Sequence, residues 1–486
     1  MRVCLIAPAW EKLVNSYPPL GLTYLAARME GAGHPVRIED FNLPPYLSQE
    51  EQIEQVADFK PDLVGITSMS HVYHGARLLA QKVKERLNCL VVVGGPHPSI
   101  FKETLLEEQS IDFVVYGEGE ETLFELVERL EAEQSPEPVA GVCWRRNGEA
   151  VRNPPRLALG DLDGLPFPAR HLLRLRDYPL RAPDGALMAT LITSRGCPYD
   201  CSFCFKGLFG RTYRQRSVAN VIQEIEELMQ DYQIRNFYLI DDLFTLNQKW
   251  LHDFTQAIIG ASLNIRWKCL ARVDRVNPHI LAQMWQAGCR EVHYGIESGN
   301  EIILKSISKN VSLSQVSQAA AWTHQAGMLV KGYFMLGLPG DTEDTVLDTV
   351  DFASRLDLDE AMFSLTTPFP GTRLWEDLVR KRPQILEQDL SGAYYYNLNG
   401  KEMLPFINVS RVADDRLAEL HQNAVKRFRH KQERAWYQDR FGKPWGGLAW
   451  SVSRVPGLRR VARALNRSGL LPLLPSEQEF LARRWA

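Results

Sequence analysis

Three cysteines stand close together, at Cys197, Cys201 and Cys204, directly after the apolar stretch 189–193. Their spacing is Cys-x3-Cys-x2-Cys. A four-iron cluster is ordinarily held by four thiolates, so three on one loop would leave the fourth iron open to an exogenous ligand. The alternative is a zinc site completed by a fourth Cys or His. Such sites usually have two Cys-x2-Cys halves, and this chain has no second pair.

Alternating strand-like and helix-like segments surround the cysteine loop. The strand-like segments are 189–193, 237–240, 265–270, 291–296, 330–336 and 361–366, and helical patterns cover 248–259, 278–287, 301–306 and 343–355. Six such strands are typical of a partial (β/α)6 barrel, in which functional residues gather at the carboxyl ends of the strands. Those ends carry Asp241-Asp242, Arg272, Gly295-Ile-Glu-Ser-Gly299 and Gly337-Leu-Pro-Gly340.

The first 135 residues show a second alternating pattern. Strand-like runs at 3–7, 63–68, 90–94 and 113–116 alternate with helical patterns at 20–30, 75–87, 100–107 and 121–131. This order predicts a parallel, doubly wound sheet, whose ligands bind where loops leave the carboxyl ends of the strands. The chain lacks Gly-x-Gly-x-x-Gly at its first helix and Gly-x4-Gly-Lys-Ser/Thr, so dinucleotides and triphosphates are poor candidates.

These motifs together resemble the radical S-adenosylmethionine (SAM) superfamily. The loops Gly94-Gly-Pro-His97 and Gly117-Glu-Gly-Glu-x-Thr122 resemble the cobalamin-binding domain that precedes the barrel in one branch of it. The resemblance implies an α/β protein with a Rossmann-like cobalamin-binding domain at 1–135 and a partial radical SAM barrel at 187–371. A linker with a small hairpin at Asn147-Gly148 fills 136–186, and an aromatic-rich, basic, mainly helical region fills 372–486.

The resemblance also implies three sets of site residues. Cys197, Cys201 and Cys204 would ligate a [4Fe-4S] cluster. SAM would be bound by Phe203, Asp241, Asp242, Arg272, Glu297, Ser298 and Gly337, although each of these can equally be a rim ion pair or a turn residue. Cobalamin would be bound by Pro19, Leu20, Thr67, Ser68, Met69, His71, Gly94, Gly95, Pro96, His97, Gly117, Glu118, Gly119 and Glu120.

The chain contains no Asp-x-His-x-x-Gly sequence, the motif in which histidine ligates cobalt. The resemblance therefore implies base-off cobalamin without that ligand, with His71, Tyr73 and His74, after the second predicted strand, as candidates for a place under the corrin. The alternative is a degenerate domain that supports the barrel and has lost its cofactor.

The expected function is a cobalamin-dependent radical SAM methyltransferase that moves a methyl group from SAM, via methylcobalamin, to an unactivated carbon. The cluster would cleave SAM to a 5′-deoxyadenosyl radical. The alternative within the family is an oxidative cyclase or ring-rearranging enzyme, similar to tetrapyrrole cyclases. A third hypothesis, from another class, is a non-catalytic iron–sulfur or zinc module that senses metal or redox state.

Composition favours a cytoplasmic, reduced protein. The chain has 486 residues, 45% hydrophobic and 24% charged, and no apolar run approaches the ~20 residues of a membrane span. Its start reads as a buried strand rather than a signal peptide. Cys4, Cys89, Cys143, Cys269 and Cys289 lie in or beside apolar runs and are expected to pack as small hydrophobic residues. We expect an external electron donor such as flavodoxin or ferredoxin and no nucleic-acid partner.

The C-terminal region is electrostatically distinct. Residues 421–486 carry a net charge of +10, whereas the whole chain carries −3, and arginines interleave with apolar residues between Trp445 and Arg467. This pattern predicts either a surface helix on anionic lipid or a helix docked on the acidic body of the same chain. The aromatic residues Tyr394–Tyr396, Trp436, Tyr437, Trp445 and Trp450 suit either a lid over an apolar small-molecule substrate, a lipid or a tetrapyrrole, or plain core packing.

Overall fold

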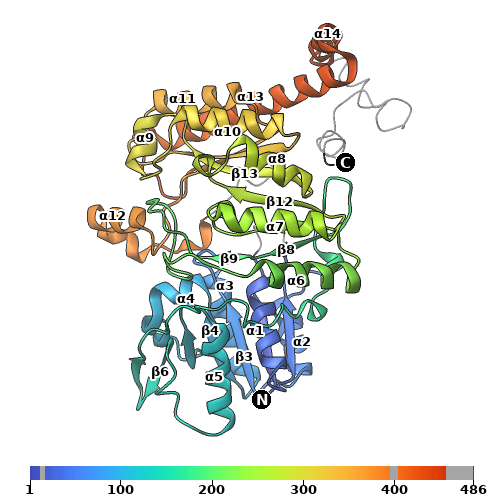
Figure 1. The fold of residues 1–486 in the computed structure, drawn as a ribbon. Helices are drawn as coiled ribbons and strands as arrows, with labels where there is room; N and C mark the ends of the chain where they lie inside the picture. Colours follow the sequence, from blue (N-terminus) through green and yellow to red (C-terminus); the bar gives the residue numbers. More distant parts are fainter. Residues whose placement is uncertain (11–16, 394–402, 456–484, 486) are drawn as a thin grey trace. The chain divides into compact units, whose positions relative to one another are not determined.

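The computed structural model describes residues 1–10, 17–393, 403–455 and 485. The chain forms two compact units, each built from segments that are far apart in the sequence (Figure 1). Unit 1 comprises Met1–Leu180, Ile192–Glu226 and Thr367–Tyr394, and unit 2 comprises Arg181–Leu191, Glu227–Thr366 and Tyr395–Ala486. The cysteine loop therefore belongs to the same unit as the N-terminal sheet.

Unit 1 contains a seven-stranded sheet in the order β2-β1-β3-β4-β5-β6-β7. The parallel strands are β1 (Val3–Ala7), β2 (Val36–Asp40), β3 (Leu63–Thr67), β4 (Leu90–Gly94) and β5 (Phe113–Val115). Strands β6 (Val142–Arg146) and β7 (Glu149–Arg152) extend one edge in antiparallel fashion. The hairpin predicted at Asn147-Gly148 joins them, with φ of 53° and 88° at its two turn residues.

Helices cover both faces of this sheet, as the predicted doubly wound fold requires. Helices α1 (Leu20–Glu30) and α5 (Glu120–Glu131) lie on one face, and α2 (Gln49–Asp58) and α3 (Tyr73–Arg86) on the other. Strand β1 illustrates this arrangement, because its successive side chains point to opposite faces of the sheet and pack in different cores. Val3 and Leu5 join the core under α1 and α5, whereas Cys4 and Ile6 join the core under α2 and α3.

Two elements of this sheet escaped the sequence prediction. Strand β2 reads Val-Arg-Ile-Glu-Asp and lies at the sheet edge, so its polar residues hide the strand pattern. Helix α2 follows it and was missed as well. The loop that carries His71 consequently follows the third strand, not the second. The helix predicted at 100–107 is divided into α4 (Pro96–Phe101) and the 3-10 turn η1 (Lys102–Glu107).

Unit 2 contains a six-stranded parallel sheet in the order β15-β14-β13-β12-β11-β8, so each strand pairs with the next along the sequence. This is the order of the predicted partial barrel. The strands are β8 (Met188–Leu191), β11 (Asn236–Leu239), β12 (Arg266–Ala271), β13 (Cys289–Glu297), β14 (Leu329–Leu336) and β15 (Glu360–Leu365). All six coincide with the predicted strand segments to within two residues at each end.

Helices connect these strands: α6 (Val218–Asp231), α7 (Gln248–Gly260), α8 (Pro278–Gln286), α9 (Glu301–Ser306), α10 (Leu313–Gln325) and α11 (Glu343–Arg355). Helices α6 and α10 were not predicted. The rings of Trp267 on β12 and Phe254 on α7 lie 5.9 Å apart, and the Tyr294 hydroxyl of β13 lies 2.8 Å from Thr323 on α10. These contacts define a helix-covered face of the sheet, and we call the opposite face the inner face.

The C-terminal region is helical where the structure describes it, with α12 (Arg373–Lys381), α13 (Asp414–Phe441) and α14 (Lys443–Ser453). Helix α13 docks on unit 2, where Arg427 pairs with Asp351 at 2.7 Å and His421 bonds the Phe363 carbonyl at 2.9 Å. The Tyr394–Tyr396 run and the basic stretch from residue 456 to 484 lie outside the described residues. Within the described ranges, no helix combines the length and the apolar character that crossing a bilayer needs.

Candidate active site

The cysteine loop of unit 1 is closed by a short ladder. Strand β9 (Ser194–Arg195) pairs with β10 (Arg214–Gln215) in antiparallel fashion, so the residues between them form one closed loop. Inside it, the Cys197 amide donates to the Gly210 carbonyl at 3.3 Å and the Cys204 amide donates to the Cys201 carbonyl at 3.2 Å. The local sequence therefore folds on itself and holds the three cysteines on one segment.

Gly196 makes the turn that leads into the first cysteine. Its φ is +85°, a backbone region that favours glycine. A Cβ at this position would also lie 2.3 Å from the Thr212 carbonyl oxygen. Only glycine thus lets the two sides of the loop approach as closely as they do.

The eight cysteines fall into two groups by burial. Cys197 and Cys201 are half-buried and Cys204 is exposed, whereas the other five are buried. Burial raises the pKa of Cys89 to about 11 and that of Cys143 to about 12, so these groups remain thiols at neutral pH. The three loop cysteines are therefore the ones that solvent reaches.

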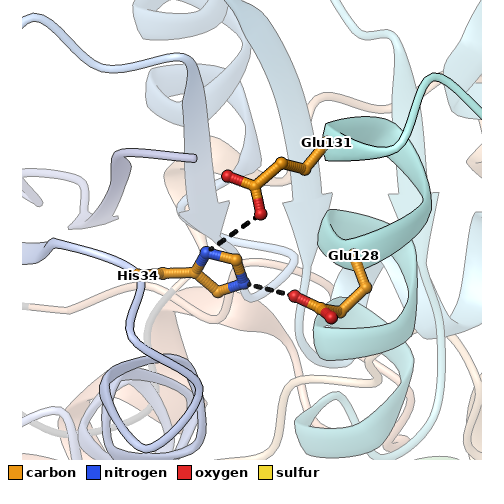
Figure 2. Close-up of side chains that lie close together, drawn as sticks. All are labelled: His34, Glu128 and Glu131. Atoms are coloured by element: carbon orange, nitrogen blue, oxygen red, sulfur yellow. Dashed lines mark hydrogen bonds and ion pairs between the residues drawn. The ribbon is translucent and has the colours of Figure 1, made fainter.

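His34, Glu128 and Glu131 form an ion-pair cluster (Figure 2). His34 Nε2 lies 2.8 Å from Glu128, its Nδ1 lies 3.7 Å from Glu131, and the amine of Met1 also pairs with Glu131. The cluster sits where α1 and α5 end. Helices of a doubly wound sheet run antiparallel to the strands, so the ends of α1 and α5 lie at the edge of the sheet opposite the ligand-binding loops.

Two arginines that flank the cysteine loop anchor it to the Gly-Glu-Gly-Glu sequence. Arg214 binds Glu118 with two bonds of 2.5 and 3.0 Å, and Arg195 binds Glu120 at 2.6 Å. All four side chains are buried. Burial lowers the pKa of Arg195, but Glu120 outweighs this and keeps the guanidinium charged. We call these four residues the loop clamp.

Two residues of the loop clamp, Glu118 and Glu120, were also predicted to bind cobalamin. Glu118 and Glu120 direct their carboxylates to the arginines of the cysteine loop. Glu224 receives two further arginines, Arg170 at 2.7 Å and Arg216. The sequence shows these charges but not their pairing, because 96 residues separate Arg214 from Glu118 and 75 separate Arg195 from Glu120.

The loops after β3 and β4 come together at the carboxyl edge of the sheet. Gly95 has a φ of +99°, and a Cβ there would lie 2.9 Å from Thr67 Oγ1. The His97 amide donates to the Ser68 carbonyl at 3.0 Å, and the His97 ring stacks on Tyr73 at 4.1 Å. The predicted residues of these two loops, including Met69, Gly94 and Pro96, thus form one continuous edge.

Two histidines of this edge are buried and neutral. Burial lowers the pKa of His71 to about 4 and that of His97 to about 3. The His71 ring lies 4.4 Å from Trp10, and His97 Nδ1 lies 3.2 Å from Ser70 Oγ. Two uncharged imidazoles among aromatic rings suit the flat, largely apolar face of a corrin better than a charged ligand.

The remaining predicted cobalamin residues lie at helix starts on the same edge. Pro19 precedes α1 and Leu20 is its first residue. Gly119 precedes α5, and the Gly117 amide donates to Ser99 Oγ at 3.0 Å. The carboxyl ends of β1, β3, β4 and β5 all contribute to this edge, which is the arrangement expected for a ligand site in a doubly wound sheet.

The predicted SAM residues of unit 2 follow adjacent strands. Asp241 and Asp242 come after β11, and the first is buried whereas the second is exposed. Arg272 follows β12 and binds Asp274 with two bonds of 2.9 and 3.3 Å. Arg272 thus makes an ion pair at the rim, and its role in SAM binding stays a prediction.

Glu297 ends β13 in an unusual conformation. Its φ is +69°, and the pairing of β13 with β14 shifts register at this residue. Its Oε1 accepts a bond of 3.0 Å from Lys309 Nζ, and both side chains are buried. Sequence reasoning missed Lys309, which lies between helices α9 and α10 in a segment without an apolar pattern.

Ser298 and Gly337 are held by neighbouring groups of unit 2. Ser298 Oγ lies 3.1 Å from Thr349 Oγ1 on α11. The Gly337 amide donates to Asp341 Oδ2 at 3.0 Å, which makes the Gly-Leu-Pro-Gly turn rigid. Phe203 is half-buried between Cys201 and Cys204, in unit 1. Asp241, Arg272, Glu297 and Gly337 thus lie at the carboxyl ends of four neighbouring strands.

Two protein-family models match the chain. The B12 binding domain matches residues 9–127. The Radical SAM superfamily matches residues 191–353, which include the three loop cysteines and the predicted SAM residues of unit 2.

Relatives and a solved structure agree with these matches. The chain is 36% identical to an uncharacterized methyltransferase of Pyrococcus horikoshii, over 77% of this chain and 83% of the relative. It is 27% identical to the anaerobic magnesium-protoporphyrin IX monomethyl ester cyclase of Cereibacter sphaeroides, over 93% and 73%. The radical SAM methyltransferase TsrM of Kitasatospora setae, solved with cobalamin and a [4Fe-4S] cluster, shares the fold, with a TM-score of 0.69, 19% identity and coverage of 97% and 100%.

Proposed function

Because this chain belongs to the cobalamin-binding radical SAM enzymes, related to their methyltransferases, we propose that it transfers a methyl group from SAM to an unactivated carbon of a small molecule. The observation that carries the proposal is the loop clamp. Buried arginines on both sides of the cysteine loop bind carboxylates of the cobalamin-type sheet. Radical formation and methyl delivery must act on one carbon, so the two cofactor sites need a fixed connection.

The residues of this chain would divide the work between them. When bound, the cluster with SAM supplies a hydrogen-abstracting radical, and cobalamin supplies the methyl group. Cys197, Cys201 and Cys204 would hold three irons as thiolates. The edge formed by the loops after β3 and β4 would receive the corrin, while Asp241 and Glu297 would hold polar groups of SAM. Buried side chains around these groups would exclude water from a reactive carbon.

The cyclase of Cereibacter sphaeroides supports a second candidate function. In this candidate the chain would use the same cofactors for an oxidative cyclisation or ring rearrangement, with a tetrapyrrole as substrate. The two candidates differ in their products from SAM. Methyl transfer makes both S-adenosylhomocysteine and 5′-deoxyadenosine, whereas cyclisation makes 5′-deoxyadenosine alone.

An anaerobic assay with methyl-labelled SAM separates the candidates without knowledge of the substrate. The protein is reconstituted with iron, sulfide and cobalamin, reduced, and assayed for S-adenosylhomocysteine, 5′-deoxyadenosine and label carried by cobalamin. We expect all three. 5′-Deoxyadenosine alone would favour the cyclase, and failure to bind cobalamin would contradict both candidates.

Two cysteine variants provide matched controls for this assay. Cys201→Ala removes a proposed cluster ligand and should abolish both the cluster absorption and SAM cleavage. Cys89→Ala removes a buried thiol of the same unit and should leave both intact. Equal behaviour of the two variants would contradict the assignment of the cluster to the cysteine loop.

A further inference from the structure

A layer of polar side chains crosses the inner face of the unit 2 sheet. Inward positions of β/α barrels are typically filled by Val, Ile and Leu. Here five neighbouring strands place charged or hydroxyl-bearing residues instead, and taking charges out of water costs several kcal/mol per ion. We call this group the inner-face layer, and its members are Tyr238, Lys268, Glu291, His293, Lys331, Tyr333 and Glu360.

Strand alternation puts this layer on the same face as the predicted SAM residues. Successive side chains of a strand point to opposite faces. Lys268 precedes Arg272 by four residues. Glu297 lies on this face as well, because a Cβ on Gly295, two residues after His293, would lie 2.5 Å from Glu297 Oε1. The layer therefore lies about 13 Å below the carboxyl rim, at about 3.3 Å per residue.

His293 organises the centre of the layer. Its Nε2 lies 2.5 Å from Glu291, while its Nδ1 lies 3.2 Å from the Tyr238 hydroxyl and 3.1 Å from the Tyr333 hydroxyl. Burial raises the pKa of Glu291, but His293 and Lys268 outweigh burial and hold it below its ordinary value. An ionised Glu291 accepts the Nε2 proton, so Nδ1 is the acceptor that both hydroxyls face.

The two lysines of the layer keep some contact with solvent. Lys268 and Lys331 keep 16% and 19% of their side chains exposed, Glu360 keeps 18% and Glu291 keeps 7%. Lys331 binds Glu360 at 2.7 Å, but Lys268 lies 3.8 Å from Glu291, too far for a strong bond. The Lys268 ammonium instead lies 4.9 Å from the centre of the Tyr238 ring. Its donors can therefore turn to a ligand without breaking a close ion pair.

We propose that the inner-face layer binds an oxyanion of the substrate, a carboxylate or a phosphate-type group, through the ammonium groups of Lys268 and Lys331. The inference rests on the proposed function, because it takes the barrel interior as the place of the substrate. Each ammonium group has three N–H donors, so the two lysines can serve several acceptor oxygens of such a group and still keep their contacts with Glu291 and Glu360. A substrate fixed there extends toward the rim, where the predicted SAM residues lie.

Binding of small anions tests this proposal without any turnover. The full-length protein, loaded with cluster and cobalamin and saturated with SAM, is titrated with inorganic phosphate and separately with acetate at constant ionic strength. We expect at least one of the two to bind with a dissociation constant on the order of 1 mM. Binding of phosphate alone points to a phosphate-type substrate group, and binding of acetate alone points to a carboxylate.

Variants locate the bound anion. Lys268→Met and Lys331→Met should each weaken binding at least tenfold, whereas Lys249→Met, at an exposed position of α7, should not. Lys268→Gln keeps a polar side chain and removes the charge, so it serves if a methionine variant fails to fold. Absence of binding by both anions, or binding that these variants leave unchanged, overturns the proposal. Anion binding in a protein that makes only 5′-deoxyadenosine would overturn methyl transfer and leave this site in place.

Discussion

At the scale of single residues, partners decide what an ionisable group can do. Glu297 stands at the rim of the unit 2 sheet with a left-handed backbone, a conformation that non-glycine residues rarely adopt. Lys309 supplies the opposite charge at 3.0 Å. Since both side chains are buried, removal of either one leaves an uncompensated charge, which is more costly than removal of both.

Substitution of Lys309 tests this pairing. Lys309→Met should lower the free energy of unfolding by roughly 3–5 kcal/mol, because Glu297 would remain buried and charged. The double variant Glu297→Gln, Lys309→Met should be more stable than the single variant. Denaturant unfolding of both proteins measures the difference, and Lys305→Met, at an exposed position of α9, is the control. An unchanged Lys309→Met protein would mean that the pair contributes nothing.

His97 provides a prediction for the dependence of stability on pH. Burial lowers the pKa of His97 to about 3, below its ordinary value of about 6.5. The unfolded chain then binds more protons in this range, so the contribution of neutral His97 is full above pH 6.5. It is lost as the pH falls toward 3.

The variant His97→Phe isolates that contribution, because it keeps a ring beside Tyr73 and Phe101 and removes the titrating group. The free energy of unfolding of the unmodified protein, relative to this variant, should fall between pH 6.5 and 4.5. Denaturant titrations at several pH values measure it. A difference that stays constant over that range would contradict a depressed pKa.

At the scale of elements, the cysteine loop depends on the close approach of its two sides. The β9 and β10 ladder brings Gly196 against Thr212, where there is no room for a Cβ. Gly210 lies in the same loop with a φ of +72°, but a Cβ there would meet no atom within 4 Å. The two glycines thus share a left-handed conformation that would strain another residue, and they differ in the space available for a Cβ.

Alanine at these positions separates the two effects. Gly196→Ala should strongly reduce the iron content after reconstitution, because the two sides of the loop must move apart to make room for the alanine Cβ. Gly210→Ala carries the conformational strain alone, about 1–2 kcal/mol, and should retain most of the iron. Iron and sulfide analysis with the visible spectrum measures both. Equal iron contents would show that the contact with Thr212 does not shape the cluster site.

At the scale of the whole molecule, the cysteine loop belongs to unit 1, which contains the cobalamin-type sheet. The Radical SAM match nevertheless covers the loop together with the barrel strands of unit 2. The loop clamp explains why the cysteine loop belongs to unit 1, because its four buried charges pair across long sequence separations. Such pairs specify one arrangement strongly, since a misplaced loop would leave charges buried and unpaired.

The loop clamp therefore predicts that cluster and cobalamin contents change together. Glu118→Gln combined with Glu120→Gln should lower the free energy of unfolding by at least about 3 kcal/mol. Both iron and cobalamin should fall after reconstitution. Glu121→Gln, whose side chain pairs with Arg28 on α1, is the control. If iron falls and cobalamin remains, the clamp serves the cysteine loop alone.

The sequence by itself determined the features that depend on neighbouring residues. The cysteine spacing is complete within eight residues, so the cluster motif needs no tertiary information. Apolar strands alternating with helices indicated both parallel sheets, because period and length are local signals. Elements with polar or small residues, such as β2 and α10, escaped prediction since their role comes from the neighbours that they pack against.

Only the tertiary structure decided which charges pair. The family resemblance implied that Glu118 and Glu120 bind cobalamin, which stays a prediction, and the fold shows that their carboxylates pair with Arg214 and Arg195. The pairing of Lys309 with Glu297 and the contacts within the inner-face layer likewise depend on which strands are neighbours in the sheet. Local patterns carry no record of such distant contacts, because chain topology brings the partners together only when the sheets form.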